Sequence, residues 1–223
     1  PKFRNESNMK YKHIIWDWNG TLLDDRWLCV DGINNGLMKR GLTPITEETY
    51  RNVFTFPVKN YYENLGFDFK KEPFEVAGDE FVNFYGQNFY RAKLHKSVRS
   101  VLDKIKHQNI TQSILSAGKH EFLLGWVEDH KLTDYFTWIK GIDNQYATGK
   151  LDLGLSFIDE LPYQNNEIIM VGDTMHDSEV ADAMKIECVL VDHGHISRDR
   201  LQKTGRKVIS NMGQVLDILT RKV

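Results

Sequence analysis

Asp17, Asn19, Gly20 and Thr21 place a carboxylate, an amide, a flexible backbone position and a hydroxyl within five positions, directly after the apolar run 13–16. A carboxylate that follows a strand lies at the strand's carboxyl end, where open α/β sheets bind their ligands. Gly20 lets the backbone turn sharply close to such a ligand. Asp17 is a side chain of the type that can act as a nucleophile. These residues predict one wall of an active site.

A second acidic group follows another apolar run, 168–171, in the segment Gly172-Asp173-Thr174-Met175-His176-Asp177. Two strands that end in acidic loops suggest one convergent site. Carboxylates brought together need a counter-charge, and a hard cation such as Mg²⁺ is the usual one. The alternative for Asp173 and Asp177 is that they cap the helix that follows the loop.

The elements that would position these side chains alternate between strand and helix after residue 93, which predicts a parallel sheet covered on both faces. We expect strands over 111–115, 138–141, 168–171, 188–191 and 208–209, and helices over 97–107, 121–130, 153–161 and 214–221.

Between the first strand and this alternating region, residues 24–92 have a helical pattern. Apolar residues at helical spacing precede Gly41, which is expected to end the first helix. Thr46, followed by two glutamates, marks the start of another helix. A third helical face begins after Pro73. The sequence therefore predicts a helical insertion over 24–92 in a core made of 1–23 and 93–223.

Taken together, these motifs resemble those of the haloacid dehalogenase superfamily, whose phosphatases carry D-x-D-G-T and G-D-x-x-x-D motifs. The sequence 17–21 is similar to the first and 172–177 to the last. Ser116, at the end of an apolar run, and Lys150 stand where the family places a phosphate-binding hydroxyl and a phosphate-neutralising lysine. The resemblance covers roughly 11–219. It implies a Rossmann-like three-layer α/β/α core with a parallel sheet, and an inserted α-helical cap of the C1 type, in the phosphoglycolate-phosphatase-like branch.

The resemblance implies that Asp17 is the nucleophile and forms an aspartyl-phosphate. Mg²⁺ would be bound by Asp17, Asp173 and the main-chain carbonyl of Asn19, with Asp177 supporting the metal site or Lys150. Ser116 and the N–H groups after it would hold phosphate oxygens, unless Ser116 only caps a helix. The substrate-binding set expected on this basis comprises Gly20, Thr21, Ser116, Ala117, Lys150 and Lys59, with Lys119 as a weaker alternative to Lys150.

Asn19 departs from the family pattern, because it stands where the phosphatases have their general acid–base aspartate. An amide side chain does not exchange a proton near neutral pH. Loss of a general acid–base group typically costs about 10²–10⁴ in rate. We therefore expect slow turnover, a substrate with a good leaving group, or a proton supplied by the substrate.

Other polar residues receive structural interpretations from the sequence. Asp24 and Asp25 are expected to be capping or hinge residues. His176 next to Asp177 is a weak candidate to replace the missing acid–base group. His176, His193 and His195 lack the spacing of a transition-metal site.

Composition fits an enzyme of this kind and excludes other classes. The 223 residues suit one core domain plus an insertion, and a net charge of −2 gives no signature of nucleic-acid binding. No apolar run approaches the length of a membrane span. Cys29 and Cys188 are expected to be buried reduced thiols, and the protein is expected to be cytoplasmic, a monomer or homodimer.

Three functions remain open from the sequence. The first is an Mg²⁺-dependent phosphatase that acts on a small phosphorylated metabolite. The second is P–C bond cleavage of the phosphonoacetaldehyde hydrolase type, with Lys59 as the Schiff-base lysine. The third is a phosphometabolite-binding protein that has lost catalysis. A dehalogenase is disfavoured because its site does not combine this acidic pair with Gly-Thr.

Overall fold

The computed structural model describes residues 9–143 and 149–220. Its main sheet has six parallel strands in the order β5-β4-β1-β6-β7-β8. These are β1 (His13–Trp16), β4 (Thr111–Lys119), β5 (Trp138–Ile142), β6 (Ile168–Gly172), β7 (Glu187–Val191) and β8 (Lys207–Ile209). The strand order reverses its direction at β1, so β1 lies between β4 and β6. The ends of these three strands therefore meet at one edge of the sheet, the place where α/β proteins bind ligands.

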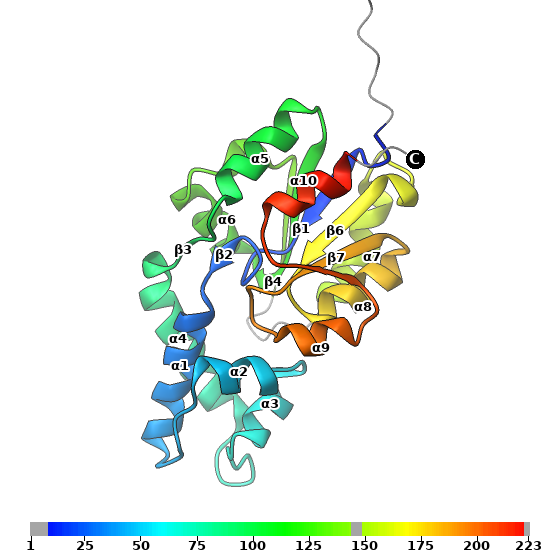
Figure 1. Cartoon of the computed structure of the whole chain (residues 1–223). Helices are drawn as coiled ribbons and strands as arrows, with labels where there is room; N and C mark the ends of the chain where they lie inside the picture. Colours follow the sequence, from blue (N-terminus) through cyan, green and yellow to red (C-terminus); the bar gives the residue numbers. More distant parts are fainter. Residues whose placement is uncertain (1–8, 144–148, 221–223) are drawn as a thin grey trace, which may run out of the picture.

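Helices cover both faces of the sheet, which confirms the predicted three-layer α/β/α core (Figure 1). On β1, Ile14 and Trp16 point into one core cluster and Ile15 into the other, as the alternation of side chains along a strand requires. The first cluster contains residues of α5 (Val98–His107), α6 (His120–Asp129) and α10 (Gly213–Leu219). The second contains residues of α7 (Lys150–Glu160), α8 (Met175–Met184) and α9 (Arg198–Gln202).

A helical insertion follows β1, consisting of α1 (Arg26–Lys39), α2 (Glu47–Val53), α3 (Val58–Asn64) and α4 (Phe74–Asn88). Two short antiparallel strands, β2 (Leu23–Asp24) and β3 (Lys93–Leu94), connect it to the rest of the chain. In Figure 1 the insertion lies at the end of the molecule toward which the strands of the main sheet point. It therefore faces the sheet edge at which Asp17 and Asp173 were expected to meet.

The helix boundaries in the insertion have the local causes that the sequence indicates. The Oγ1 atom of Thr46 accepts a hydrogen bond of 3.1 Å from the backbone N–H of Thr49 at the start of α2. Gly41 follows the end of α1 with φ of 66°, in the left-handed region that glycine adopts without strain. Both predictions are confirmed.

Other predicted boundaries differ from the structure by a few residues. The strand β4 runs to Lys119 instead of Leu115, with a register irregularity against β5 between these two residues. The helix α7 begins at Lys150 instead of Leu153, because Gly149 supplies a left-handed N-terminal position with φ of 100°. Lys150 therefore lies in the first turn of α7. The predicted end of the last helix, Arg221, lies outside the described residues.

Three short 3₁₀ turns complete the described chain: Phe89–Arg91, Thr133–Tyr135 and Asn165–Glu167. Among the helices of the described ranges, none combines the length and the apolar character needed to cross a membrane.

Candidate active site

Three buried carboxylates meet at the carboxyl edge of the sheet. The register of β1 against β6 pairs Trp16 with Val171, and the backbone N–H of Asp17 donates to the carbonyl of Val171 over 2.9 Å. Asp17 and Asp173, which follow these two strands, are thereby brought together. One carboxylate oxygen from each of Asp17, Asp173 and Asp177 lies within 4.8 Å of the others. The convergence predicted from the two acidic motifs is present.

Lys150 is the counter-charge within this group. Its Nζ atom lies 2.6 Å from Oδ1 of Asp17 and 2.6 Å from Oδ1 of Asp177, and its side chain is only 3% exposed. Burial alone lowers the pKa of this lysine, but the two carboxylates outweigh burial and raise its pKa above the usual value. Lys150 is therefore a fixed cation that touches the nucleophile candidate.

Asp177 has its oxygens occupied by donors of the protein. Its Oδ2 atom accepts from the hydroxyl of Thr174 over 2.8 Å and from the backbone N–H groups of Thr174 and Asp173 over 2.9 and 3.1 Å. The same residues form the capping box at the start of α8. The sequence offered two alternative roles for Asp177, capping of the following helix and support of Lys150. Asp177 has both roles in the structure. A side chain so engaged has less to offer a metal ion than Asp17 and Asp173.

The donor set around Asp17 and Asp173 fits a divalent cation. Burial raises the pKa of Asp17 well above its usual value, with the charges of Asp177 and Asp173 adding to the effect and Lys150 opposing it. Burial also raises the pKa of Asp173 to about 6. One lysine thus leaves the three carboxylates short of positive charge, and carboxylate oxygens are the ligands that Mg²⁺ prefers.

Gly20 and Thr21 pack directly against these carboxylates. The hydroxyl of Thr21 lies 3.1 Å from Oδ2 of Asp17 and 3.0 Å from Oδ1 of Asp173, so it can donate to either. Gly20 has φ of 77°, and a Cβ atom there would come within 2.3 Å of Oδ2 of Asp173 and of the ring of His195. A side chain at position 20 would therefore push these groups apart.

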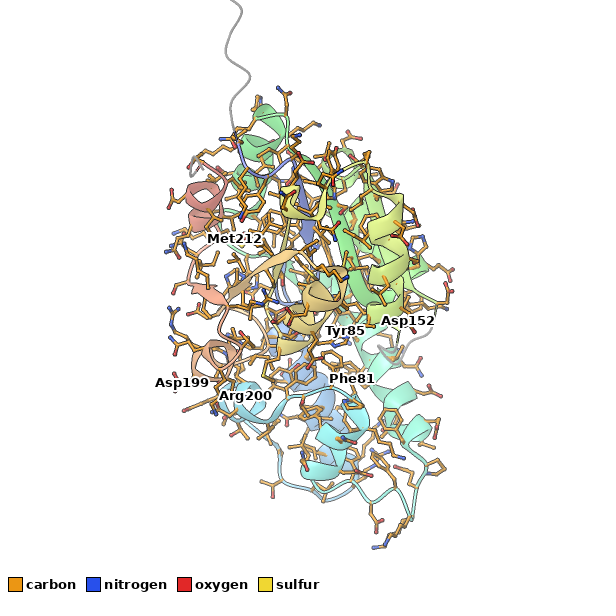
Figure 2. The ribbon with its side chains drawn as sticks, turned by 90° about the vertical axis from the view of Figure 1, so that its right-hand side faces the viewer. Phe81, Tyr85, Asp152, Asp199, Arg200 and Met212 are labelled. Atoms are coloured by element: carbon orange, nitrogen blue, oxygen red, sulfur yellow. The ribbon has the colours of Figure 1, made fainter. Side chains whose placement is uncertain are left out.

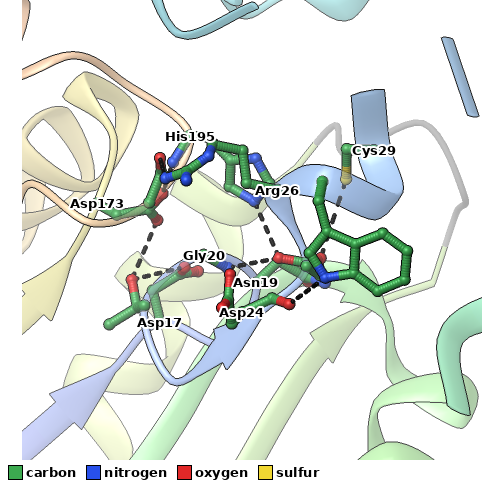
Figure 3. A network of polar contacts seen from close by, with 12 residues as sticks. Asp17, Asn19, Gly20, Asp24, Arg26, Cys29, Asp173 and His195 are labelled. Carbon is green, nitrogen blue, oxygen red and sulfur yellow. Dashed lines mark hydrogen bonds and ion pairs between the residues drawn. The ribbon is translucent and has the colours of Figure 1, made fainter. Parts of the chain in front are cut away.

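The amide of Asn19 takes part in a buried polar network (Figure 3). Its Nδ2 atom donates to Oδ2 of Asp25 over 2.8 Å and to the hydroxyl of Tyr85 over 3.0 Å. The hydroxyl of Tyr85 in turn donates to Oδ2 of Asp25 over 2.8 Å, and the backbone N–H of Gly20 donates to Oδ1 over 2.8 Å. Asn19 therefore acts as a hydrogen-bond donor to a carboxylate.

His195 is the cation that pairs with Asp25. Its Nε2 atom lies 3.2 Å from Oδ1 of Asp25, its Nδ1 atom lies 2.9 Å from the hydroxyl of Tyr50, and its backbone N–H donates to Oδ2 of Asp173 over 2.7 Å. Burial lowers the pKa of His195, but the charge of Asp25 and its hydrogen bond outweigh burial and raise the pKa to about 9.

Asp25 itself stays ionised in this network. Burial would raise its pKa, but the charge of His195 and the hydrogen bonds from His195, Asn19 and Tyr85 together lower it. The sequence assigned Asp25 to a helix cap or hinge. It does occupy the N-cap position of α1, but its side chain makes no capping hydrogen bond and points to Asn19 and His195 instead. The partnership of His195 with Asp25 has no signal in the spacing of the sequence, because 170 positions separate the two residues.

Ser116 is buried in the irregular last part of β4, where its Oγ atom accepts a hydrogen bond of 2.9 Å from the backbone N–H of Gly118. Ala117, Gly118 and Lys119 line the cavity described below. Ser116 itself does not line this cavity, and its predicted phosphate-binding role stays a prediction. The alternative that Ser116 caps a helix is wrong, because Ser116 lies within β4 and the N-cap of α6 is Lys119.

Several candidates lie elsewhere. Lys59 is exposed, its ammonium lies 5.8 Å from the ring centre of Phe69, and it does not line the cavity. The structure thus does not bring Lys59 to Asp17. His193 lies against His95, with ring centres 3.8 Å apart, while His176 does line the cavity. Cys29 and Cys188 are both free and buried, as predicted.

A cavity of about 220 Å³ extends from the carboxylates into the insertion. Asp17, Lys150 and Asn19 form its polar end, while aromatic side chains of the insertion and of α6 surround the remainder. Phe81 and Tyr85, both on α4, lie where the insertion meets the rest of the molecule (Figure 2). A ligand in this cavity would contact the nucleophile candidate and the insertion at the same time.

Comparisons with known proteins agree with this arrangement. A putative pyrophosphatase of Caldanaerobacter subterraneus subsp. tengcongensis is 22% identical over 95% of this chain and 96% of its own. A phosphoglycolate phosphatase of Pseudomonas fluorescens is 23% identical over 82% of this chain and 70% of its own. Solved structures with the same fold include a predicted phosphatase from Clostridium acetobutylicum, with a TM-score of 0.79 and 19% identity over 93% of this chain and 97% of the other. Another is a putative haloacid dehalogenase-like hydrolase from Bacteroides fragilis, with a TM-score of 0.80 and 22% identity over 92% of this chain and 100% of the other. Residues 14–191, which make up most of the chain and include both acidic motifs, match the family model of the haloacid dehalogenase-like hydrolases. This protein therefore belongs to that family.

Proposed function

We propose that this protein is a Mg²⁺-dependent phosphatase that hydrolyses a small phosphate monoester through an aspartyl-phosphate at Asp17. The observation that carries the proposal is the contact of Lys150 with both Asp17 and Asp177 inside a buried acidic group. A lysine held against a carboxylate nucleophile stabilises the negative charge of the phosphoryl group in the transition state of its transfer. The named relatives that act on phosphate compounds, among them a phosphoglycolate phosphatase, support the same class of substrate.

In this reaction an Oδ atom of Asp17 forms a bond to phosphorus, and the bond from phosphorus to the leaving oxygen breaks. Lys150 offsets the charge that develops on the phosphoryl oxygens. Ala117 and Lys119, which line the cavity beside Asp17, would contribute backbone N–H groups to one of those oxygens, because the N–H of Gly118 already bonds Ser116. Asp17, Asp173 and the main-chain carbonyl of Asn19 would hold Mg²⁺, which would neutralise phosphate charge and keep Asp17 ionised. Water then hydrolyses the aspartyl-phosphate, regenerates Asp17 and releases inorganic phosphate.

Asn19 affects both halves of this cycle. As an amide it neither protonates the leaving oxygen nor removes a proton from the attacking water. Its hydrogen bonds to Asp25 and Tyr85 leave it a positioning residue. We infer a slow enzyme in which water attack on the phospho-enzyme limits kcat.

The proposal is tested by phosphate release in the presence of Mg²⁺ from a panel of esters, including phenyl phosphate. We compare wild type with Asp17→Asn and with Asp152→Asn, a change at an exposed position in the first turn of α7 (Figure 2). Wild type and Asp152→Asn should release phosphate, and Asp17→Asn should fall at least 10³-fold. Equal activity of Asp17→Asn would rule out the aspartyl-phosphate.

The two other functions considered from the sequence find less support. For P–C bond cleavage the sequence offers Lys59 as the Schiff-base amine, and Lys59 is exposed and does not line the cavity. Labelling of Lys59 in a borohydride trapping experiment would support P–C bond cleavage instead of phosphate-ester hydrolysis. A binding protein without catalysis predicts that inorganic phosphate raises the Tm while no ester of the panel is hydrolysed. The intact contacts of Lys150 with Asp17 and Asp177 favour the enzyme.

A further inference from the structure

The substrate class can be narrowed from two independent features of the cavity, the composition of its walls and the absence of a proton donor at Asn19. We propose that the substrate is an aryl phosphate, a monoester in which the phosphate oxygen is attached to a single aromatic ring. This inference rests on the proposed phosphatase function and deepens it.

The walls of the cavity are aromatic on two sides. Phe81 and Tyr85 of α4 contribute one side, with ring centres 6.2 Å apart. Phe122 and Trp126 of α6 contribute another, and the ring centres of Tyr85 and Trp126 lie 5.5 Å apart in an edge-to-face arrangement. Phe56, in the connection between α2 and α3, faces the ring of His176 at 5.2 Å. Rings arranged in this way offer faces and edges against which another aromatic ring packs.

The insertion contributes no cationic side chain to the cavity among the described residues that line it. Among the described lining residues, the cationic side chains come from the core, and the one charged residue of the segment 24–92 is Asp25, an anion. Lys119, which also lines the cavity, pairs with Glu121 over 3.6 Å and lies 5.0 Å from the ring centre of Phe122. An anionic leaving group such as glycolate would therefore face apolar walls with no cation of the insertion to meet it. Burial of an unpaired carboxylate is strongly unfavourable.

The volume of the cavity indicates the size of the organic group attached to the phosphate. An apolar cavity of about 150 Å³ accommodates benzene. The 220 Å³ available here suits one ring together with a phosphate, which would lie against Lys150 and Asp17.

The chemistry at the other end of the cavity selects for the same group. Without an acid at position 19, the leaving oxygen departs with its electron pair as an anion and takes a proton from solvent afterwards. A phenol has a pKa of about 10, as in the side chain of tyrosine, whereas an alkyl alcohol resembles water, at about 16. A phenolate is therefore the better leaving group by about six pKa units. An aryl ester satisfies both the apolar walls and the missing proton donor.

The test compares kcat/KM for phenyl phosphate, benzyl phosphate and phosphoglycolate with wild type and Mg²⁺. Phenyl and benzyl esters both present one ring but differ in the acidity of the leaving oxygen, so the comparison separates ring recognition from leaving-group chemistry. We use kcat/KM because it reports the step that forms the aspartyl-phosphate, even where later water attack limits kcat. We expect the order phenyl, benzyl, phosphoglycolate, with at least a 10²-fold advantage of phenyl over benzyl phosphate.

A pair of valines on α4 tests the role of the wall. Val82 lines the cavity, while Val76 on the same helix is 42% exposed and does not line it. Val82→Lys should lower kcat/KM for phenyl phosphate at least tenfold and raise it for phosphoglycolate, while Val76→Lys should change neither. If Val82→Lys fails to fold, Phe81→Leu provides a milder change, which should lower kcat/KM for phenyl phosphate by a larger factor than for phosphoglycolate.

The outcomes separate this inference from the function on which it rests. No phosphate release from any ester by folded, Mg²⁺-supplied protein would reject the phosphatase function. Equal kcat/KM values for benzyl phosphate and phenyl phosphate would reject selection by the leaving group. Release with phosphoglycolate preferred to phenyl phosphate would reject the aryl class while the phosphatase function stands.

Discussion

The amide of Asn19 donates a hydrogen bond of 2.8 Å to the carboxylate of Asp25, and both side chains line the cavity that contains Asp17. The negative charge of this pair therefore lies at the start of α1, in the connection to the helical insertion. Tyr85 and His195 hold the same carboxylate from α4 and from the segment after β7. The network thus joins the insertion to the core beside the proposed nucleophile.

Lys150→Met is expected to destabilise the protein strongly. It leaves Asp17 and Asp177 buried without their shared cation, and breaking a buried ion pair in this way typically costs about 3–5 kcal/mol. The free energy of unfolding should be measured with urea in EDTA. Lys140→Met is the matched control, because Lys140 pairs with Glu160 at the surface and such pairs are worth about 0–1 kcal/mol. Equal losses for the two variants would show that Lys150 has no special structural role.

Asp173→Asn should remove most of the stabilisation that Mg²⁺ gives to the folded protein. At pH 8 in EDTA the variant should be more stable than wild type by up to about 3 kcal/mol, because ionised Asp173 is disfavoured in the folded state, where burial raises its pKa to about 6. Wild type should gain stability as Mg²⁺ is added, by about 2.7 kcal/mol at a hundredfold excess over Kd, and the variant should gain little.

Asp199→Asn, at an exposed position of α9, is the control for this experiment (Figure 2). Its unfolding curve should follow that of wild type with and without Mg²⁺. The same Mg²⁺ response in all three proteins would place the cation away from Asp173.

The parts of the site that the sequence predicted are those fixed by strand order. Asp17 and Asp173 each directly follow a buried strand, so the parallel pairing of β1 with β6 was sufficient to bring them together. The helical insertion was also predictable, because apolar periodicity and the signals at Gly41 and Thr46 mark its helices.

The parts that escaped prediction depend on side chains that meet only after folding. Tyr85 and His195 reach Asp25 from segments 60 and 170 positions away, and nothing in their local sequence marks them. Lys59 had a suitable type for a cavity lysine, but the path of α3 leaves it at the surface beside Phe69. Pattern alone could not tell which face of a short helix turns toward the cavity.

The stability that depends on His195 should fall as the pH rises. Its pKa is raised from 6.5 to about 9 in the folded protein, so its contribution is fully present below pH 6.5 and is lost as the pH rises through 9. The shift corresponds to about 3 kcal/mol. The difference in free energy of unfolding between wild type and His195→Gln, measured in EDTA from pH 6.5 to 10, should shrink by that order. A constant difference for His195→Gln would contradict the ion pair with Asp25.

Exchange of the two side chains at positions 19 and 25 tests whether they work as a unit. Asn19→Asp alone places a second buried carboxylate at hydrogen-bond distance from Asp25, and an uncompensated buried charge of this kind costs about 3 kcal/mol or more. Asp25→Asn alone leaves His195 without its anion. The double variant Asn19→Asp/Asp25→Asn again has one carboxylate and one amide, so its loss should be smaller than the sum of the single losses by about 1–3 kcal/mol.

Enzyme activity, measured on the same two single variants and the double variant, gives a second test of whether positions 19 and 25 act together. The double variant carries a carboxylate where the related phosphatases have their acid–base group, so it should hydrolyse benzyl phosphate faster than wild type while phenyl phosphate changes less. The advantage of phenyl over benzyl phosphate should therefore shrink, by up to the 10²–10⁴ that a general acid supplies. Additive stability losses together with an unchanged phenyl-to-benzyl ratio would show that Asn19 and Asp25 are independent.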